Sequence, residues 1–187
     1  MTSNHRRRLL GAVVALPFAN GAFAQDLPLT PACGPQAELT PRQTEGPFYT
    51  PKSPQRSSLI EPGSKGERLL LTGRVVSRQC RPVAKALLDF WHCDQNGEYD
   101  NAGFRYRGHL YADAQGRFRL ETIFPALYPG RARHIHVKAQ APGRRILTTQ
   151  LYFPGDARDF LWREELVVAM ERRPQGRLAA FQFIVDA

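Results

Sequence analysis

Two histidines stand one residue apart in the segment 127-LYPGRARHIHVKA-139, and they are the first residues of this sequence that could do chemistry. Side chains at positions i and i+2 of a β-strand point to the same face, so the imidazoles of His134 and His136 would emerge side by side. Imidazole binds zinc, copper, iron and nickel. The spacing therefore indicates a metal site, although two unrelated surface histidines would give the same short pattern.

The other ligands of such a site must be of a different residue type. A cupin-like site would need a glutamate shortly after the pair and a third histidine in a later strand. Residues 137–140 contain no acid, and no histidine follows His136. His92 follows Trp91 in an apolar segment, which favours a packed or hydrogen-bonded side chain over a ligand. A zinc hydrolase would need a carboxylate ligand or base that the sequence does not place near the histidines.

Tyrosines are the candidate ligands that remain. Tyr128 stands in a Leu-Tyr-Pro-Gly turn just before the histidines, and Tyr106 lies in 104-FRYRGHLY-111. A phenol with a pKa near 10 ionises at neutral pH only beside a strong cation, and Fe(III) is the cation that favours phenolate oxygen. Two tyrosinates and two neutral imidazoles would balance two of its three charges and leave room for one anionic ligand.

Five segments, in this order, resemble the intradiol ring-cleavage dioxygenases, which are non-haem Fe(III) enzymes that open catechols between their two hydroxyls. The segments are 44-TEGPFY-49, 88-LDFWHCDQNGEYDN-101, 104-FRYRG-108, 123-IFPALYPGRARHIHVK-138 and 150-QLYFPGD-156. They cover most of the chain from residue 40 to residue 156. The resemblance implies a catechol-type substrate, O2 as the second substrate, a muconate-type product, and Fe(III) bound by Tyr106, Tyr128, His134 and His136.

The resemblance also implies roles for residues around the metal. Tyr128 would receive a proton from the substrate, Arg131 would stabilise developing negative charge, and Gln150 would line the pocket beside it. Arg107 and Arg133 match no residue with an assigned role in the family, and we expect them to be surface charges.

Two small residues depart from the best-known members of the family. Gly130 stands where those members have an aromatic residue, and Ala132 stands where they have a proline. The sequence does not distinguish protocatechuate, catechol, hydroxyquinol and halogenated catechols as substrates. An alternative from another functional class is a non-catalytic, transthyretin-like β-sandwich module that binds ligands without iron.

Short strands separated by turn residues must position these side chains. This cadence predicts an all-β fold over residues 68–187, a sandwich or barrel of antiparallel sheets, and of the two we expect an antiparallel β-sandwich. Residues 25–67 are rich in Pro, Gly, Ser and Thr and predict an extended N-terminal arm. The segment 160–171 has helical spacing after Asp159, which predicts one short C-terminal helix. The expected strands are 69–76, 86–91, 104–111, 117–123, 133–140, 146–153 and 177–185.

Residues 1–24 are typical of a signal peptide. Three arginines precede an apolar stretch that ends in Ala22-Phe23-Ala24, a small-residue cleavage pattern. The Arg6-Arg7-Arg8 run also resembles a twin-arginine signal. The apolar stretch is too short to span a bilayer comfortably. We therefore expect a periplasmic or secreted protein with no membrane span after cleavage.

Net charge and cysteine content indicate which partners and which disulfide to expect. The formal net charge of +9 falls to +6 without residues 1–24, because that segment contains three of the 26 basic residues and none of the 17 acidic ones. The charge is spread without a lysine-rich block, which argues against a nucleic-acid partner. Export permits a disulfide, and Cys33 with Cys80 is the expected pair, whereas Cys93 is expected to be buried. The sequence does not determine an oligomeric state.

Overall fold

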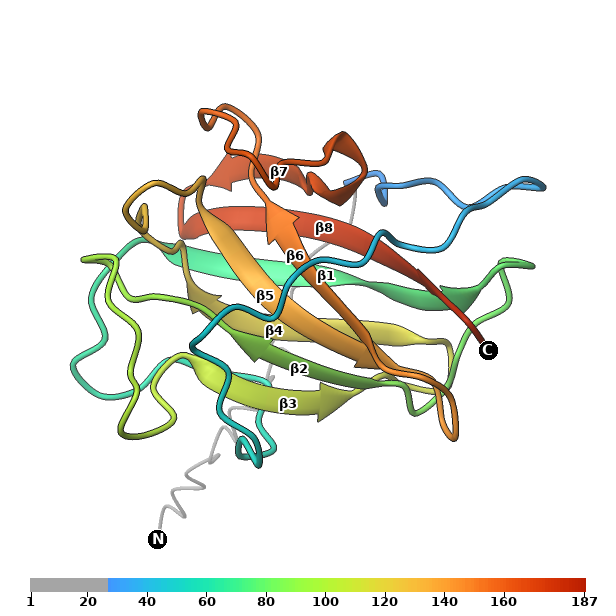
Figure 1. The fold of residues 1–187 in the computed structure, drawn as a ribbon, viewed down its shortest axis with the longest axis horizontal. Coiled ribbons are helices and arrows are strands. Elements are labelled where there is room, and N and C mark those ends of the chain that lie inside the picture. The colour runs from blue at the N-terminus through green and yellow to red at the C-terminus, as the bar shows by residue number, and fades with distance from the viewer. Residues whose placement is uncertain (1–26) are drawn as a thin grey trace, which may run out of the picture.

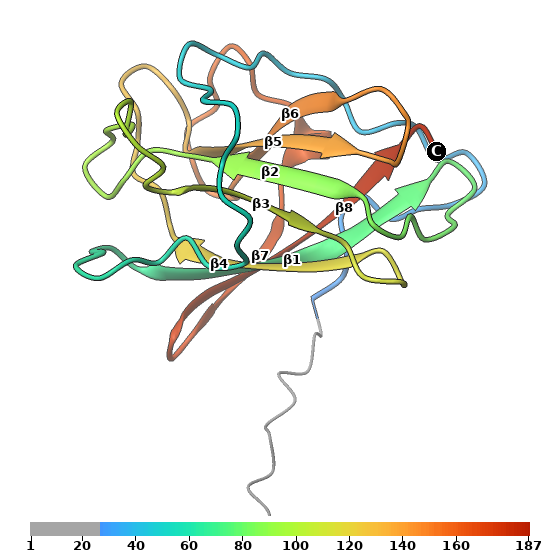
Figure 2. The ribbon, with the colours of Figure 1, turned by 90° about the horizontal axis from the view of Figure 1, so that it is seen from below.

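Two four-stranded sheets form the protein in this computed structural model, which describes residues 27–187 (Figures 1 and 2). The predicted signal peptide lies outside the described residues. One sheet has the order β4-β1-β8-β7, and the other has the order β3-β2-β5-β6. The first sheet comprises β1 (Arg68–Ser77), β4 (Arg117–Ile123), β7 (Ala169–Arg173) and β8 (Gly176–Val185), and the second comprises β2 (Leu87–Trp91), β3 (Arg107–Tyr111), β5 (His134–Gln140) and β6 (Leu147–Tyr152).

The predicted β-sandwich is confirmed, with one difference in strand direction. Strands β1 and β8 run parallel over nine paired residues, whereas the other strand pairs are antiparallel. Figure 2 shows the two sheets as separate layers, with β1, β4 and β7 in one and β2, β3, β5 and β6 in the other. The side chains between these layers form the hydrophobic core.

Alternation along the strands decides which side chains enter the core. On β5, Ile135, Val137 and Ala139 are fully buried members of the core cluster, and on β2 Leu88 and Phe90 join them. Complete burial of a leucine or phenylalanine side chain contributes about 2 kcal/mol each to stability. The residues between them, including His134 and His136 on β5, therefore point to the outer face of the β3-β2-β5-β6 sheet.

The N-terminal arm runs across the strands and is tied to them by backbone hydrogen bonds. The N–H of Gln43 donates to the carbonyl of Thr148, and the N–H of Arg56 donates to the carbonyl of His109. The segment between these two points passes over the outer face of β5 and β2 (Figure 1). The arm thus covers the face of the sheet on which the two histidines lie.

The predicted C-terminal helix is wrong. Within residues 160–171 the chain forms only one 3-10 turn, Glu164–Leu166, before it enters β7. Val167 and Val168 are β-branched and favour extended backbone, and the N–H of Val168 donates to the carbonyl of Tyr152 at 3.0 Å. Pairing with β6 and then with β8 outweighs the weak helical spacing of the sequence.

A disulfide joins Cys33 in the arm to Cys80 in the turn after β1, as expected. Cys93 is a free and buried thiol whose Sγ lies 3.4 Å from the carbonyl oxygen of Ala126. Burial raises the pKa of this thiol to about 11, so it stays protonated at neutral pH. Among residues 27–187, no helix has the length and apolar character needed to cross a membrane.

Candidate metal centre

The imidazoles of His134 and His136 lie side by side on the outer face of β5, with their Nε2 atoms 3.1 Å apart. Both side chains are buried under the arm. The Nδ1 atom of His134 lies 2.7 Å from the carbonyl oxygen of Ala132. Because a carbonyl can only accept, Nδ1 carries the proton and Nε2 presents a lone pair to the space shared with His136.

A third donor enters the same space from the loop between β2 and β3. The hydroxyl of Tyr99 lies 3.2 Å from Nε2 of His134, and the Tyr99 ring centroid lies 6.1 Å from that of His136. Asp94 shapes the start of this loop, because its carboxylate accepts the N–H groups of Asn96 and Glu98. Tyr99 was not among the expected ligands, although it lies within the quoted segment 88–101.

Tyr128 stands next to this group, on the loop between β4 and β5. Its half-buried ring packs at 5.8 Å from the ring of Tyr99 and 5.6 Å from that of Phe48, measured between centroids. A tight turn follows, in which the N–H of Arg131 donates to the carbonyl of Tyr128 and Gly130 adopts a φ of +75°. Glycine at this position meets the need for a left-handed backbone.

The structure contradicts the expected role of Tyr106. Tyr106 pairs with His92 across the start of β3, and their rings stack with centroids 5.2 Å apart. His92 points to the core, because it follows the outward-facing Trp91, and Tyr106 is itself a member of the core cluster. Its side chain therefore lies on the opposite side of the sheet from the two imidazoles.

The expected position of His92 is the signal in the sequence that could have placed Tyr106 on the core side of the sheet. Sequence reasoning places His92 in a packed, core-like position, and the residue opposite it must share that side of the sheet. His92 is indeed satisfied within the protein, with Nδ1 donating to the carbonyl of Cys93 and Nε2 accepting from the hydroxyl of Thr122, both at 2.7 Å.

Arg131 and Gln150 contact each other beside the histidines. An Nη2 hydrogen of Arg131 is donated to Oε1 of Gln150 at 2.7 Å, and Nε of Arg131 forms an ion pair with Asp159 at 2.7 Å. Gln150 lies directly opposite His136 in the pairing of β5 with β6, and its Nε2 donates to the carbonyl of Thr44 in the arm. Asp159 thus holds the guanidinium of Arg131 in place.

Of the two arginines expected at the surface, Arg107 is buried, and both form polar contacts within the protein. Arg107 is only 1% exposed, and its guanidinium donates to the backbone carbonyls of Asp100 and Phe48. It therefore connects the loop that carries Tyr99 to the arm. Nothing in the sequence indicates this role, because Arg107 lies in an arginine-rich segment. Arg133 is partly exposed and forms a 2.6 Å ion pair with Asp156.

Burial keeps the two imidazoles and the Tyr99 phenol uncharged at neutral pH when no cation is bound. Burial lowers the pKa of His134 to about 4 and lowers the pKa of His136 well below 6.5, so both imidazoles are neutral at pH 7. Burial raises the pKa of the Tyr99 phenol above its ordinary value of 10.0. Only a strongly charged cation would ionise this phenol at neutral pH.

The donor set fits Fe(III) better than it fits zinc. Two imidazole lone pairs converge with a phenol, and a second phenol stands beside the first. Among residues 27–187, no group of three or more His, Cys, Asp or Glu side chains is arranged to hold a metal ion. A metal at this place would therefore rely on tyrosine oxygen, which a trivalent iron favours.

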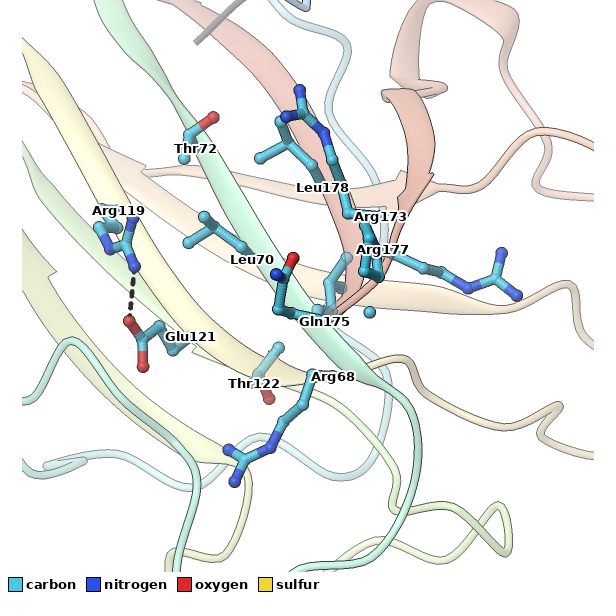
Figure 3. A pocket seen from close by; sticks show the side chains of 13 residues that line it. Arg68, Leu70, Thr72, Arg119, Glu121, Thr122, Arg173, Gln175, Arg177 and Leu178 are labelled. Carbon is cyan, nitrogen blue, oxygen red and sulfur yellow. Dashed lines mark hydrogen bonds and ion pairs between the residues drawn. The ribbon is translucent and has the colours of Figure 1, made fainter. Parts of the chain in front are cut away.

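A separate cavity of about 620 Å³ lies on the outer face of the other sheet (Figure 3). Its lining includes Arg68, Arg119 and Arg177 above a floor that contains Leu70 and Leu178. Arg119 pairs with Glu121 and Arg177 pairs with Glu67, each at 2.7 Å. None of the residues at the histidine pair lines this cavity, so it is not part of the candidate metal centre.

Comparisons with curated proteins point to enzymes that act on catechols. The chain is 31% identical over 149 residues to catechol 1,2-dioxygenase 2 of Acinetobacter lwoffii, which covers 66% of this chain and 54% of that protein. It is 31% identical over 160 residues to hydroxyquinol 1,2-dioxygenase of Nocardioides simplex, which covers 70% and 55%. The chain spans a little over half the length of these two relatives.

Solved structures of dioxygenases share the fold. The dioxygenase domain of a dioxygenase carbohydrate-binding protein fusion from Streptomyces sp. SirexAA-E superposes with a TM-score of 0.78 at 49% identity, covering 80% of this chain and 99% of that one. Hydroxyquinol 1,2-dioxygenase from Pseudomonas putida DLL-E4 gives 0.74 at 28% identity, covering 80% and 67%. The family model described as Dioxygenase matches residues 44–185. With the fold and the paired histidines already described, this match shows that the chain belongs to the intradiol ring-cleavage dioxygenase family.

Proposed function

We propose that this protein is an exported, Fe(III)-dependent intradiol dioxygenase that cleaves a catechol-type aromatic with O2 to a muconate-type diacid. One observation carries the proposal. Nε2 of His134 lies 3.1 Å from Nε2 of His136 and 3.2 Å from the hydroxyl of Tyr99, and both imidazoles are buried under the arm. A binding module without a metal would have no need to collect three such donors at one point.

The residues that would hold the metal are Tyr99, Tyr128, His134 and His136. Tyr99 takes the place of Tyr106 in this proposed ligand set, and the other three residues are retained from the sequence-based prediction. When bound, Fe(III) supplies the charge that ionises the phenols and the Lewis acidity that activates a bound catecholate. Phenolates at Tyr99 and Tyr128 would balance two of the three charges of Fe(III) and leave one for an anionic ligand.

Tyr128 is suited to accept a proton from the substrate. The rings of Tyr128 and Tyr99 are both half-buried, but Tyr99 stacks on the ring of Phe48 and places its hydroxyl beside His134, whereas Tyr128 makes only edge contacts with the rings of Phe48 and Tyr99. A phenol held by edge contacts would be freer to move and to accept a proton than the stacked ring of Tyr99. We assign Tyr128 as the base that receives the first proton of the catechol.

Arg131 is suited to stabilise the anion that develops during ring cleavage. Its guanidinium is held by Asp159 on one side and by Gln150 on the other, so its remaining N–H donors are directed without further ordering. Donors that are fixed before the reaction stabilise a transition state more effectively than mobile ones. Gln150 fixes the arginine and is itself fixed by the carbonyl of Thr44.

The substrate class rests on the relatives. Those named above are described as catechol and hydroxyquinol dioxygenases, and they support a small aromatic with two adjacent hydroxyls as the substrate. The expected signal peptide at residues 1–24, which the twin-arginine or the general secretory route would export, supports a periplasmic or secreted location. The Cys33–Cys80 disulfide also supports that location, because such bonds persist in oxidising compartments.

The test combines colour, iron content and oxygen uptake. Purified protein should be burgundy, contain one iron per chain, and consume O2 with at least one member of a panel of catechols. A muconate-type product should form in step, followed by its ultraviolet absorption. Colourless, iron-free protein that binds catechols without oxygen uptake would reject the proposal and identify a transthyretin-like binding module.

A further inference from the structure

The two histidines of the candidate metal centre are held in different ways. His134 donates its Nδ1 hydrogen to the carbonyl of Ala132. The Nδ1 of His136 is buried and has no hydrogen-bond partner among residues 27–187. Histidine ligands of metals almost always donate their second nitrogen to an acceptor, which fixes the ring orientation. Something else must orient the imidazole of His136.

Trp91 takes that place in the structure. Its indole stacks on the imidazole of His136 with centroids 4.7 Å apart and planes inclined by only 6°. The two residues are direct partners in the pairing of β2 with β5, so the sheet sets their separation. The buried indole Nε1 has no acceptor within the described part of the chain, so this tryptophan contributes its flat face rather than its N–H group.

The arm keeps Trp91 and His136 in place. The ring of Tyr49 packs on Trp91 at 4.8 Å between centroids, and its hydroxyl donates to Asp89 at 3.1 Å. Gly46 lies so close to His136 that a Cβ atom at this glycine would stand 3.4 Å from Cε1 of the imidazole. Rotation of the imidazole would therefore have to displace either the indole or the arm.

We propose that Trp91 is a positioning residue that orients His136 toward the metal by stacking, in place of the hydrogen bond that orients His134. This inference rests on the proposed function for the identity of the metal. Because Nδ1 of His136 has no acceptor in the part of the chain that the structure describes, the bond that His136 would form to the metal depends on the indole face. Loss of that face frees one ligand and leaves the other three where they are.

The experiment compares three variants with the wild-type protein. Trp91→Leu removes the flat face, Trp91→Phe keeps a flat ring, and Phe181→Leu is the matched control. Phe181 is fully buried in the core of the sandwich and packs against Phe183, away from the histidines. Both leucine variants lose a large buried aromatic ring, so the general effect on folding is matched.

The first readout needs no metal. In the NMR spectrum of metal-free protein, the ring protons of His136 should lie upfield because of the indole ring current. Trp91→Leu should remove this shift, Trp91→Phe should retain part of it, and Phe181→Leu should leave it unchanged. A His136 signal that does not respond to Trp91→Leu would overturn the inference.

The second readout is metal affinity, with the tyrosinate-to-iron absorption band recorded on the same samples. Trp91→Leu should weaken iron binding by about tenfold or more and shift the band, and Trp91→Phe should recover most of the affinity. Equal affinities in wild type and Trp91→Leu, or an equal loss in Phe181→Leu, would overturn the inference. If wild-type protein takes up no iron, the proposed function fails, and the same comparison with Co(II) then decides whether Trp91 positions His136.

Discussion

Arg131 and Asp159 form an ion pair of 2.7 Å, and the same carboxylate oxygen accepts the backbone N–H of Ala132 at 2.9 Å. Both side chains are largely buried. One carboxylate therefore holds the arginine proposed to stabilise the reacting anion and the backbone that leads into the histidine strand. The carbonyl of that same Ala132 binds the imidazole of His134, so Asp159 supports the arginine and the first histidine together.

Asp159→Asn should impair both catalysis and stability. Loss of the charged partner lets Arg131 move, which should reduce kcat/KM by about tenfold to a hundredfold, and the weaker hydrogen bonds should cost about 2 kcal/mol of unfolding free energy. Oxygen uptake and urea titration measure the two effects. Glu121→Gln is the control, because it breaks an exposed ion pair with Arg119 and should change stability by less than about 0.5 kcal/mol.

The same variant should alter the acid limb of the stability curve. Burial alone would raise the pKa of Asp159, but hydrogen bonds from Arg131, Ala132 and Leu161 outweigh it and hold the pKa below its ordinary value of 3.8. A carboxylate with a lowered pKa stabilises the fold above the ordinary pKa and loses that contribution as the pH falls below it. Asp159→Asn should therefore flatten the loss of stability below about pH 4, and an unchanged acid limb would contradict this assignment.

Tyr99→Phe and Tyr106→Phe should separate the two candidate ligands. Tyr99→Phe removes the hydroxyl beside the imidazoles, so we expect loss of the visible colour, weaker iron binding and loss of turnover. Tyr106→Phe removes a buried hydroxyl that has no hydrogen-bond partner among residues 27–187, so colour should persist and stability should be unchanged or higher. Iron analysis and visible spectra decide between them, and the reverse pattern would restore Tyr106 as the ligand.

His92 should make the metal-free protein sensitive to mild acid. Burial lowers its pKa to about 4 from an ordinary value of 6.5. A histidine with a lowered pKa contributes its full stability above pH 6.5, and that contribution declines as the pH falls toward 4, by up to about 3 kcal/mol.

Urea titration at pH 7.5 and at pH 5 measures this decline. His92→Gln should show a smaller decline than the wild-type protein over the same interval. A slope remains in the variant, because His134 also has a pKa lowered to about 4 by burial. An identical decline in both proteins would show that His92 is not the group that titrates.

Removal of the disulfide should destabilise the fold. Cys33 and Cys80 are 47 residues apart, and closing a loop of that size stabilises the folded state by up to about 4 kcal/mol in the chain-entropy estimate. The Cys33→Ser, Cys80→Ser double variant should therefore unfold at lower urea concentration than the wild type. Reductant should lower the wild-type midpoint and leave that of the double variant unchanged, and Cys93→Ser should respond to reductant as the wild type does.

Strand positions could be predicted from the sequence because alternation along a strand is a local property. The pair His134 and His136 needed only the two-residue period to be placed on one face. The helix predicted over 160–171 failed for a non-local reason, since pairing with β6 and β8 determines that segment. Strand partners distant in sequence outweigh local spacing.

The choice of Tyr106 instead of Tyr99 as an expected iron ligand has a similar physical cause. Tyr99 and Tyr106 lie seven residues apart in a loop whose path depends on Asp94, Asp100 and Arg107. Nothing in the local spacing says which ring reaches the outer face of the sheet. The pairing of Tyr106 with His92, which points to the core, places the Tyr106 ring on the inner side of the sheet. Arg107 was misjudged for the same reason, because burial of a cation depends on carbonyl groups that the fold brings to it.

The seven residues of β5 divide two tasks between alternate positions. Odd-numbered Ile135, Val137 and Ala139 hold the sandwich together, and even-numbered His134 and His136 lie on the far side, where we propose that the chemistry takes place. The scaffold can therefore persist while the reaction evolves. Substitutions at even positions can change or abolish catalysis in a domain that still folds, so an inactive descendant of this protein would keep its architecture.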